Sequence, residues 1–439
     1  MAYASSTAPM RTFAPFAVTL LVAASSHANS RLPATNQLVV APDAPQTMLL
    51  RATFGFLFTH DGGATWDWLC ESAIPLAGQQ DPAVTLLAGG VVLSAQQDGL
   101  MSSPDVGCSW APVPNTAKRV FVDVTRTPDG TSGYAIENLY TTTTDAGALV
   151  FATTVWQSSN AGQSWQTLPG AIDGTLAIDT LDVAPSDPTR IYVTGEVLGA
   201  DHASMLVSTD GGQSYSEHPI AFTTNETGAF ITGVDPTNAD VVYVRTLAVD
   251  PKLGTESSRL LVSIDGGQSF AEKWNGGKLL GFALSPDGTR VYVGTLAGLE
   301  AASTADFAFV QRSTVSIACL TMVDSTLYAC SDEASSGFVL GASTDDGGSF
   351  KPLLKLETIH GPLSCPHGSP AAQCMGQWPT FAEQLGIDAG SSGPPPPAAG
   401  GCQTAPTSTA LWLVPLALTV LVRLRPTRRA WATHRGRRP

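Results

Sequence analysis

The residues best suited to chemistry in this chain are carboxylates on three stretches that we interpret as long loops, at residues 137–155, 196–204 and 247–259. Two carboxyl groups held several Å apart can serve as the acid and the base, or the acid and the nucleophile, that cleave a glycosidic bond. The candidates are Glu137, Asp145, Glu196, Asp201, Asp250 and Glu256. For any single one of them, a solvated loop residue on a very acidic protein is the better explanation. A sequence does not define the separation of two side chains.

Other residues in the same stretches extend this hypothesis. His202, Lys252 and Arg259 are further polar candidates, and Tyr140 and Trp156 lie near Glu137 and Asp145, where an aromatic ring could support a sugar. No Asp-rich calcium loop of the DxDxDG type is present, so we expect no metal and no cofactor.

Two histidines follow the repeats near a pair of cysteines and need a separate interpretation. His360 and His367 near Cys365 and Cys374 resemble a zinc cluster, but an exported chain favours a disulfide there. The GxSxG, HExxH and GxxxxGK[ST] motifs of other enzyme classes do not occur.

One eight-residue pattern recurs six times: Ser or Thr, any residue, Asp or Asn, any residue, Gly, any residue, Ser or Thr, aromatic. The copies are residues 59–66, 103–110, 158–165, 208–215, 263–270 and 343–350. Their third positions are Asp61, Asp105, Asn160, Asp210, Asp265 and Asp345. Residues 303–310 lie in the long gap before the last copy and are interpreted as a decayed seventh copy.

The pattern suits a turn between two strands. The Asp or Asn side chain accepts hydrogen bonds from the turn, the Gly allows a positive φ, and the aromatic residue packs between sheets. Short strand patterns surround each copy, four to a repeat of about 40 to 50 residues, which is typical of a propeller blade. We predict an all-β fold with a single β-propeller, most simply of seven blades of four antiparallel strands, with six or eight as alternatives.

The repeat is similar to the Asp-box, or BNR, repeat of sialidases, xyloglucan-active hydrolases, sortilin-type receptors and the photosystem II assembly factor family. For sialidases this resemblance implies an Arg-Ile-Pro motif and a Tyr/Glu nucleophile pair, whereas this chain has Arg31-Leu32-Pro33 and no matching pair. Xyloglucan hydrolases form their cleft between two propellers, and these repeats suffice for one. Sortilin-type receptors add a Cys-rich module, where this chain has two cysteines.

The ends of the chain indicate export. Residues 1–28 have the form of a signal peptide, with Arg11 before a short apolar run. We assign 29–355 to the propeller, 356–388 to a Cys-containing extension and 389–401 to a Gly/Ser/Pro linker. Residues 402–439, with an apolar run at 410–422 and an Arg-rich end, resemble myxosortase-type C-terminal sorting tails, which implies that Cys402 is the processing point. A plain membrane anchor is the alternative.

Charge and cysteine content agree with that assignment. Residues 29–402 keep all 37 acidic residues but 15 of the 23 basic ones, a net charge of −22, which argues against a nucleic-acid partner. Seven cysteines suggest three disulfides and one free residue. The pairings we expect are Cys70 with Cys108, Cys319 with Cys330, and Cys365 with Cys374.

We therefore expect a monomeric propeller, exported to the surface or outer envelope of a bacterium and either retained there through its tail or released. Its expected role is non-catalytic: a binding or scaffold module for a protein or glycan at the face opposite the eight-residue turns. The alternative is a glycoside hydrolase, sialidase-like or active on another glycan, that uses the acidic residues of that face.

Overall fold

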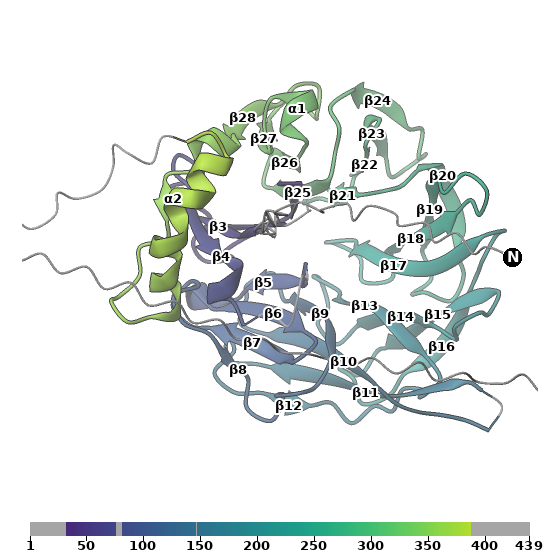
Figure 1. The fold of residues 1–439 in the computed structure, drawn as a ribbon. Coiled ribbons are helices and arrows are strands. Elements are labelled where there is room, and N and C mark those ends of the chain that lie inside the picture. The colour runs from purple at the N-terminus through teal and green to yellow at the C-terminus, as the bar shows by residue number, and fades with distance from the viewer. Residues whose placement is uncertain (1–31, 76–80, 146, 388–439) are drawn as a thin grey trace, which may run out of the picture. The chain divides into compact units, whose positions relative to one another are not determined.

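The computed structural model describes residues 32–75, 81–145 and 147–387. They form seven antiparallel sheets of four consecutive strands each, arranged around a centre as the blades of a β-propeller (Figure 1). The predicted fold class and the blade number of seven are confirmed.

The strand bounds follow the order of the chain. Blades one and two are β1 (Thr35–Val40), β2 (Met48–Ala52), β3 (Gly55–Thr59), β4 (Asp67–Cys70), and β5 (Val84–Leu86), β6 (Val92–Gln96), β7 (Gly99–Ser103), β8 (Ala111–Pro112). Blades three and four are β9 (Phe121–Arg126), β10 (Gly133–Thr143), β11 (Leu149–Ser158), β12 (Gln166–Thr167), and β13 (Ala177–Val183), β14 (Ile191–Glu196), β15 (His202–Ser208), β16 (Ser216–Ala221). Blade five is β17 (Glu226–Val234), β18 (Val242–Val249), β19 (Glu256–Ser263) and β20 (Ala271–Gly277). Blades six and seven are β21 (Gly281–Leu284), β22 (Arg290–Thr295), β23 (Gly298–Ser303), β24 (Val310–Ser313), and β25 (Cys319–Val323), β26 (Thr326–Cys330), β27 (Leu340–Ser343), β28 (Lys351–Leu354).

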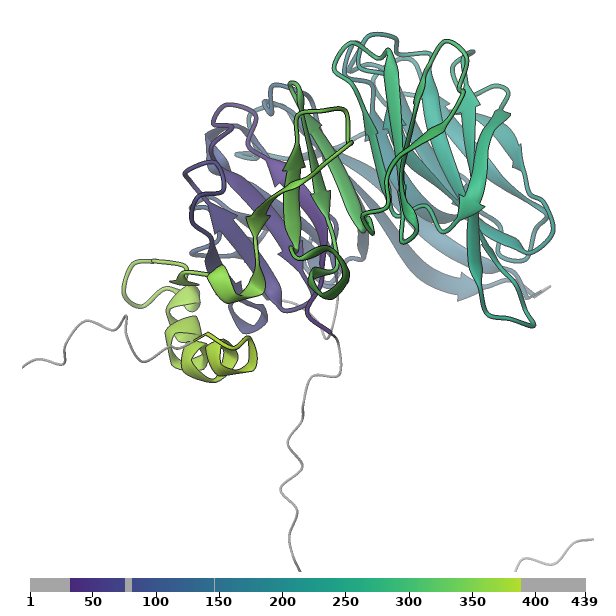
Figure 2. The same cartoon turned by 90° about the horizontal axis from the view of Figure 1, so that it is seen from above.

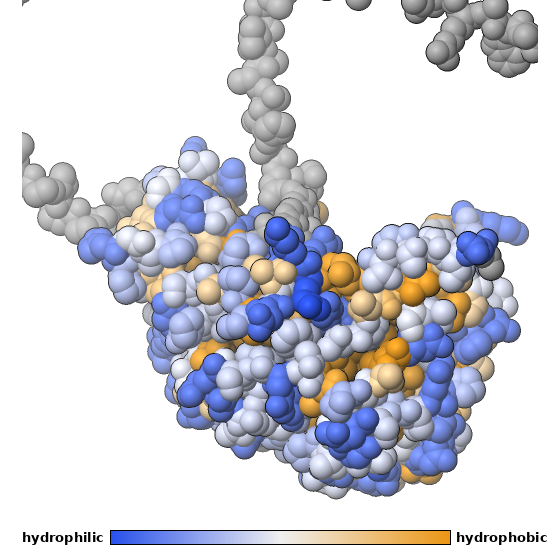
Figure 3. Space-filling view, turned by 90° about the horizontal axis from the view of Figure 1, so that it is seen from below, coloured by the Kyte–Doolittle hydropathy of each residue, from blue (hydrophilic) through white to orange (hydrophobic). Residues whose placement is uncertain are grey.

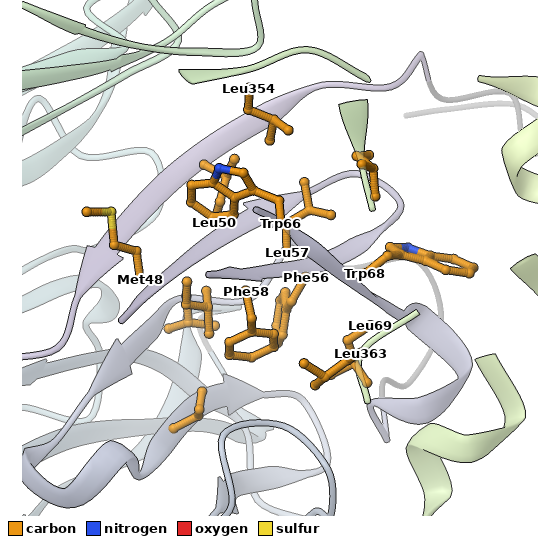
Figure 4. Packing of buried hydrophobic residues seen from close by; sticks show 14 of the residues in the cluster. Met48, Leu50, Phe56, Leu57, Phe58, Trp66, Trp68, Leu69, Leu354 and Leu363 are labelled. Carbon is orange, nitrogen blue, oxygen red and sulfur yellow. The ribbon is translucent and has the colours of Figure 1, made fainter. Parts of the chain in front are cut away.

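The core lies between neighbouring blades. The second and third strands of a blade are covered on both sides, which is why β3 and β6 are buried along their whole length and consist largely of apolar and small residues. Trp66, the last residue of the first eight-residue turn, is fully buried near Leu50 and Leu57, whereas Phe56 and Phe58 lie on the other side of the blade (Figure 4). The rim shown in Figure 3 is mostly hydrophilic, and hydrophobic side chains gather in a hollow within it.

All six copies of the eight-residue pattern form the turn between the third and fourth strands of a blade. In blade four, Asp210 Oδ1 accepts bonds from Ser208 Oγ and Ser214 N, and Asp210 Oδ2 accepts from Ser214 Oγ at 2.6 Å. Gly212, at φ 83°, donates its N–H to Ser208 Oγ. Residues 303–310 occupy the same place in blade six, between β23 and β24, so the structure agrees with a decayed copy.

Two of the predicted long loops are mainly hairpin strands. β10 and β11 pair from Gly133 and Ser158 to Thr143 and Leu149, so the stretch 137–155 is paired along most of its length, and its hairpin extends beyond its neighbours (Figure 1). β18 and β19 likewise leave residues 250–255 as a turn. The physical reason is that runs of Thr, Val, Leu and Phe favour extended pairing even where a blade needs no further strand length.

The ring closes without exchange of strands between the ends of the chain. Blade seven contacts blade one directly, where Thr321 Oγ1 donates to Leu38 O at 3.0 Å and Thr35 Oγ1 donates to Val339 O at 2.7 Å. The four core strands of each blade therefore come from one continuous stretch, and a short C-terminal strand adds only to the outer edge of blade one.

A C-terminal segment covers the outer edge of blade one (Figure 2). β29 (Gly361–Pro362) adds to β4 in parallel, and α2 (Cys374–Gln384) follows it. Phe381 of α2 stacks on Trp68 of β4, with ring centroids 4.3 Å apart. In the described part of the chain, α1 (Glu333–Ser336) is the other α-helix, and short 3-10 turns lie at Glu71–Ala73, Ala88–Gly90, Leu356–Thr358 and Pro370–Gln373.

The disulfides correct two of the three expected pairings. Cys319 is bonded to Cys330 across neighbouring strands, as predicted. The other two bonds join Cys70 to Cys374 and Cys108 to Cys365, so the pairings Cys70 with Cys108 and Cys365 with Cys374 are wrong. Short separation along the chain suggested the wrong partners, because the C-terminal segment returns to blades one and two and brings distant cysteines together.

None of the helices in the described ranges is long and apolar enough to cross a membrane. The predicted signal peptide, the linker, Cys402 and the tail with its apolar run at 410–422 lie outside the described residues.

Candidate functional site

The antiparallel order of the strands gives the propeller two distinct faces. One face carries the eight-residue turns together with the turns between first and second strands. The other, which we call the hairpin face, carries the turns between second and third strands and the crossovers between blades. All the predicted acidic candidates lie on the hairpin face or on the strand ends that lead to it.

Glu137 of β10 is a buried structural carboxylate. Its side chain is 1% exposed, and both of its oxygens lie 2.9 Å from Arg119 Nη1. Trp156 Nε1 donates to Glu137 Oε2 at 3.2 Å, and the Trp156 ring is itself buried below the Arg119 guanidinium. The idea that Trp156 presents a ring to a sugar is therefore wrong, whereas Tyr140 is half exposed.

Arg259 of β19 forms a second buried pair, with a partner that sequence reasoning missed. Glu226, the first residue of β17, accepts bonds from Arg259 Nε at 2.7 Å and Arg259 Nη2 at 2.6 Å. Burial disfavours the Glu226 carboxylate, but bonds from Arg259, Thr246 and the Thr223 N–H outweigh it, so its pKa lies below its ordinary value. This pair forms one wall of a pocket of about 220 Å³.

The remaining exposed candidates are occupied with local partners. Asp201 pairs with His202 at 3.0 Å, and Glu256 pairs with Lys278 at 2.9 Å. Asp250 accepts the N–H groups of Lys252 and Leu253 in its own turn, and these bonds lower its pKa. Asp145 lies in the turn between β10 and β11.

Glu196 differs from the other candidates because it meets a second acid. Asp179 of β13, which sequence reasoning missed, lies close enough for the charge of Glu196 to act on it. Burial, and after it the charge of Glu196, raise the pKa of Asp179 to about 8, and burial also raises the pKa of Glu196. Asp179 Oδ2 and Glu196 Oε2 are both buried without a hydrogen-bond partner.

Large apolar side chains form a second feature of the hairpin face. Of the eleven large hydrophobic residues that are exposed in the described structure, seven lie on the hairpins of blades three to six. They are Tyr140 and Leu149, Val197 and Leu198, Val249 and Leu253, and Leu296. Sequence reasoning identified these stretches from their length and acidity, and missed the apolar residues that they share.

Among the described residues, no group of three His, Cys, Asp or Glu side chains lies so that it could hold a metal ion. Near the C-terminal segment, Cys365 and Cys374 are occupied in disulfides, and His360 Nδ1 lies 2.9 Å from Asp67. The residues that resembled a zinc cluster in the sequence therefore form disulfides and one histidine–carboxylate contact.

No known protein family and no curated protein matches the sequence. Among solved structures, hydrazine synthase of Kuenenia stuttgartiensis matches with a TM-score of 0.50 at 11% identity, over 73% of this chain and 98% of that one. An ancestral GH74 enzyme matches with a TM-score of 0.49 at 13% identity over 73% of this chain, which spans 48% of that enzyme. YCF48 from Cyanidioschyzon merolae matches with a TM-score of 0.44 at 12% identity, over 68% of this chain and 92% of that one. At such identities the likeness is one of fold alone.

Proposed function

We propose that this chain is an exported Asp-box propeller of the bacterial cell surface, held there by its C-terminal tail, and that it binds a protein partner through its hairpin face without catalysing a reaction. The observation that carries this proposal is the set of seven exposed apolar side chains on the hairpins of four successive blades. A face of a soluble domain on which exposed apolar side chains gather is typical of an interaction site.

The chemistry of these side chains favours a protein over a glycan. Six of the seven are aliphatic, and Tyr140 is the single aromatic residue among them. Aliphatic side chains bury well against other apolar side chains, whereas sugars need hydrogen bonds that these residues do not supply. Acidic residues flank them, since Asp145, Asp201 and Asp250 lie in the same turns, so the partner surface is expected to be apolar with a basic rim.

The arrangement of the carboxylates supports a non-catalytic role. Glu137, Glu226 and Glu256 each face a cation in a different hydrogen-bonded pair. A glycosidase requires two carboxyl groups that converge on one bond of the substrate. Three disulfides support export, since such bonds persist in oxidising compartments.

The proposal is tested with the full-length chain on an immobilised panel of envelope proteins and of neutral and acidic polysaccharides. Leu198→Ser with Leu253→Ser should reduce retention of the protein ligand at least tenfold. Ile264→Ser is the matched control, because Ile264 is 76% exposed on the opposite face. Equal retention of both variants would contradict a partner on the hairpin face.

One observation favours a second candidate function, hydrolysis of a glycan. Asp179, with its pKa raised to about 8, and the neighbouring Glu196 resemble an acid that is protonated at neutral pH beside a second carboxyl group. Release of reducing sugar from the polysaccharide panel, abolished by Asp179→Asn or Glu196→Gln and kept in Asp201→Asn, would establish this function instead.

A further inference from the structure

Near the centre of the ring lies a pocket of about 210 Å³ that none of the candidate residues above lines. Its walls come from the innermost strands of blades one, five, six and seven, with Leu38, Ile231, Phe282 and Leu320 as apolar surface. One cation, Arg245 of β18, lines it as well. An engineered cavity of about 150 Å³ holds benzene, so this pocket has room for a ligand body of that size with a small polar group.

Arg245 is held in place but is not neutralised. Its guanidinium lies 4.3 Å from the centre of the Phe230 ring, so one face of the cation is covered. Among the described residues it forms no hydrogen bond and no ion pair within 4 Å. No N–H group of Arg245 is fully buried without a partner, so its five donors remain accessible to a ligand that enters the pocket.

The other polar side chains around the pocket are occupied. Gln37 exchanges bonds with the backbone of Val84, Asn36 Oδ1 accepts from Arg51, and Thr321 donates to Leu38 O. The acid that acts most strongly on Arg245 is Asp179, whose raised pKa keeps it largely neutral at pH 7. Arg245 is therefore the one unpaired charge that the described walls present to a ligand.

We propose that this pocket binds an organic carboxylate, with Arg245 as its anchor and the apolar walls around the body of the ligand. A guanidinium offers two parallel N–H donors that match a carboxylate. A phosphate fits less well, because a dianion calls for several cations and Arg245 is the single cation among the described residues that line the pocket. The carboxylate can belong to a free acid or to the C-terminus of a peptide.

Binding is tested on the full-length chain by calorimetry with benzoate, with benzamide as its neutral counterpart, and with an acetylated Leu-Leu dipeptide as free acid and as amide. At least one carboxylate should bind, at least tenfold more tightly than its amide. Preference for benzoate or for the dipeptide distinguishes a free acid from a peptide terminus. Absence of carboxylate binding up to millimolar concentration, or equal binding of acid and amide, would overturn the proposal.

Variants assign the site to Arg245. Arg245→Gln should weaken binding at least tenfold, whereas Lys252→Met, which removes one exposed positive charge from a hairpin turn, should leave it unchanged. Arg245→Lys keeps the positive charge but lacks the two parallel N–H donors. It is the replacement test if Arg245→Gln does not fold. Affinity should also fall as pH rises through about 8, where Asp179 ionises. Glu256 is the other carboxylate whose charge acts on Arg245. Unchanged affinity in both Arg245 variants would overturn the assignment.

Discussion

Cys70, the last residue of β4 in the first blade, is disulfide-bonded to Cys374, the first residue of the C-terminal helix, 304 positions later in the chain. A second bond joins Cys108 of the second blade to Cys365. Together they fix the segment after the last blade to the first two blades. This propeller therefore fastens its C-terminal segment with two disulfides in addition to the pairing of β29 with β4.

Loss of the Cys70–Cys374 bond should destabilise the fold by less than its separation of 304 positions along the chain suggests. While Cys108–Cys365 remains, the loop closed by Cys70–Cys374 contains about 47 residues, for which loop entropy corresponds to about 4 kcal/mol. We expect Cys70→Ala with Cys374→Ala to cost about 2–4 kcal/mol in the free energy of unfolding. Cys319→Ala with Cys330→Ala, a bond that spans 11 positions, should cost about 1 kcal/mol less in denaturant titrations. The reverse order would contradict this explanation.

The eight-residue turns should govern stability in acid. Hydrogen bonds from Ser214 and Ser208 lower the pKa of Asp210 to about 2, below its value in the unfolded chain. Its contribution is therefore complete above pH 4 and lost as the pH falls toward 2. Asp210→Asn should fold normally, since Asn160 fills the same position in blade three and donates to Ser164. Thermal unfolding between pH 5 and 2 should show a shallower loss of Tm in this variant, and an unchanged slope would contradict the prediction.

The Glu226–Arg259 pair should matter for stability because Glu226 is 1% exposed. Removal of the Glu226 charge leaves Arg259, which is 17% exposed, with Glu272 at 3.6 Å as its remaining acidic partner. Glu226→Gln is expected to cost about 3 kcal/mol. Glu256→Gln removes the carboxylate of an exposed pair and should cost at most about 1 kcal/mol. Equal costs in urea titrations would show that burial of the pair is not the cause.

Asp179 should lower stability at alkaline pH. Because burial raises its pKa to about 8, the folded state resists its ionisation, and stability is lost as pH rises from about 4 through 8. Asp179→Asn should match the wild type near pH 4 and exceed its Tm by a few degrees at pH 8. Asp201→Asn, at a fully exposed side chain, is the control and should leave the Tm profile unchanged. A wild-type profile that is flat above pH 5 would contradict the prediction.

The fold was predictable because its signal is local and repeated. The Ser, Asp and Gly of each eight-residue turn bond to one another within a few residues, so spacing alone identifies them. The pairing of Cys70 with Cys374 was not predictable, because it depends on where the last segment returns after seven blades.

The candidate site likewise has a part that the sequence predicts and a part that it does not. The face was predictable from strand order, but the environment of each acid was not. Glu137 and Glu196 both lie on the second strand of a blade and have the same side chain, yet one lies against Arg119 and the other near Asp179. The partners belong to other strands, and no spacing in the sequence identifies them.

The central claim is tested most directly by measuring binding and turnover together on the same panel. For the wild type we predict saturable retention of a protein ligand and no release of sugar or peptide. Retention should be lost in Leu198→Ser with Leu253→Ser and kept in Ile264→Ser. Sugar release that depends on Asp179 and Glu196, or retention that survives in the double variant, would contradict a non-catalytic propeller that binds through its hairpin face.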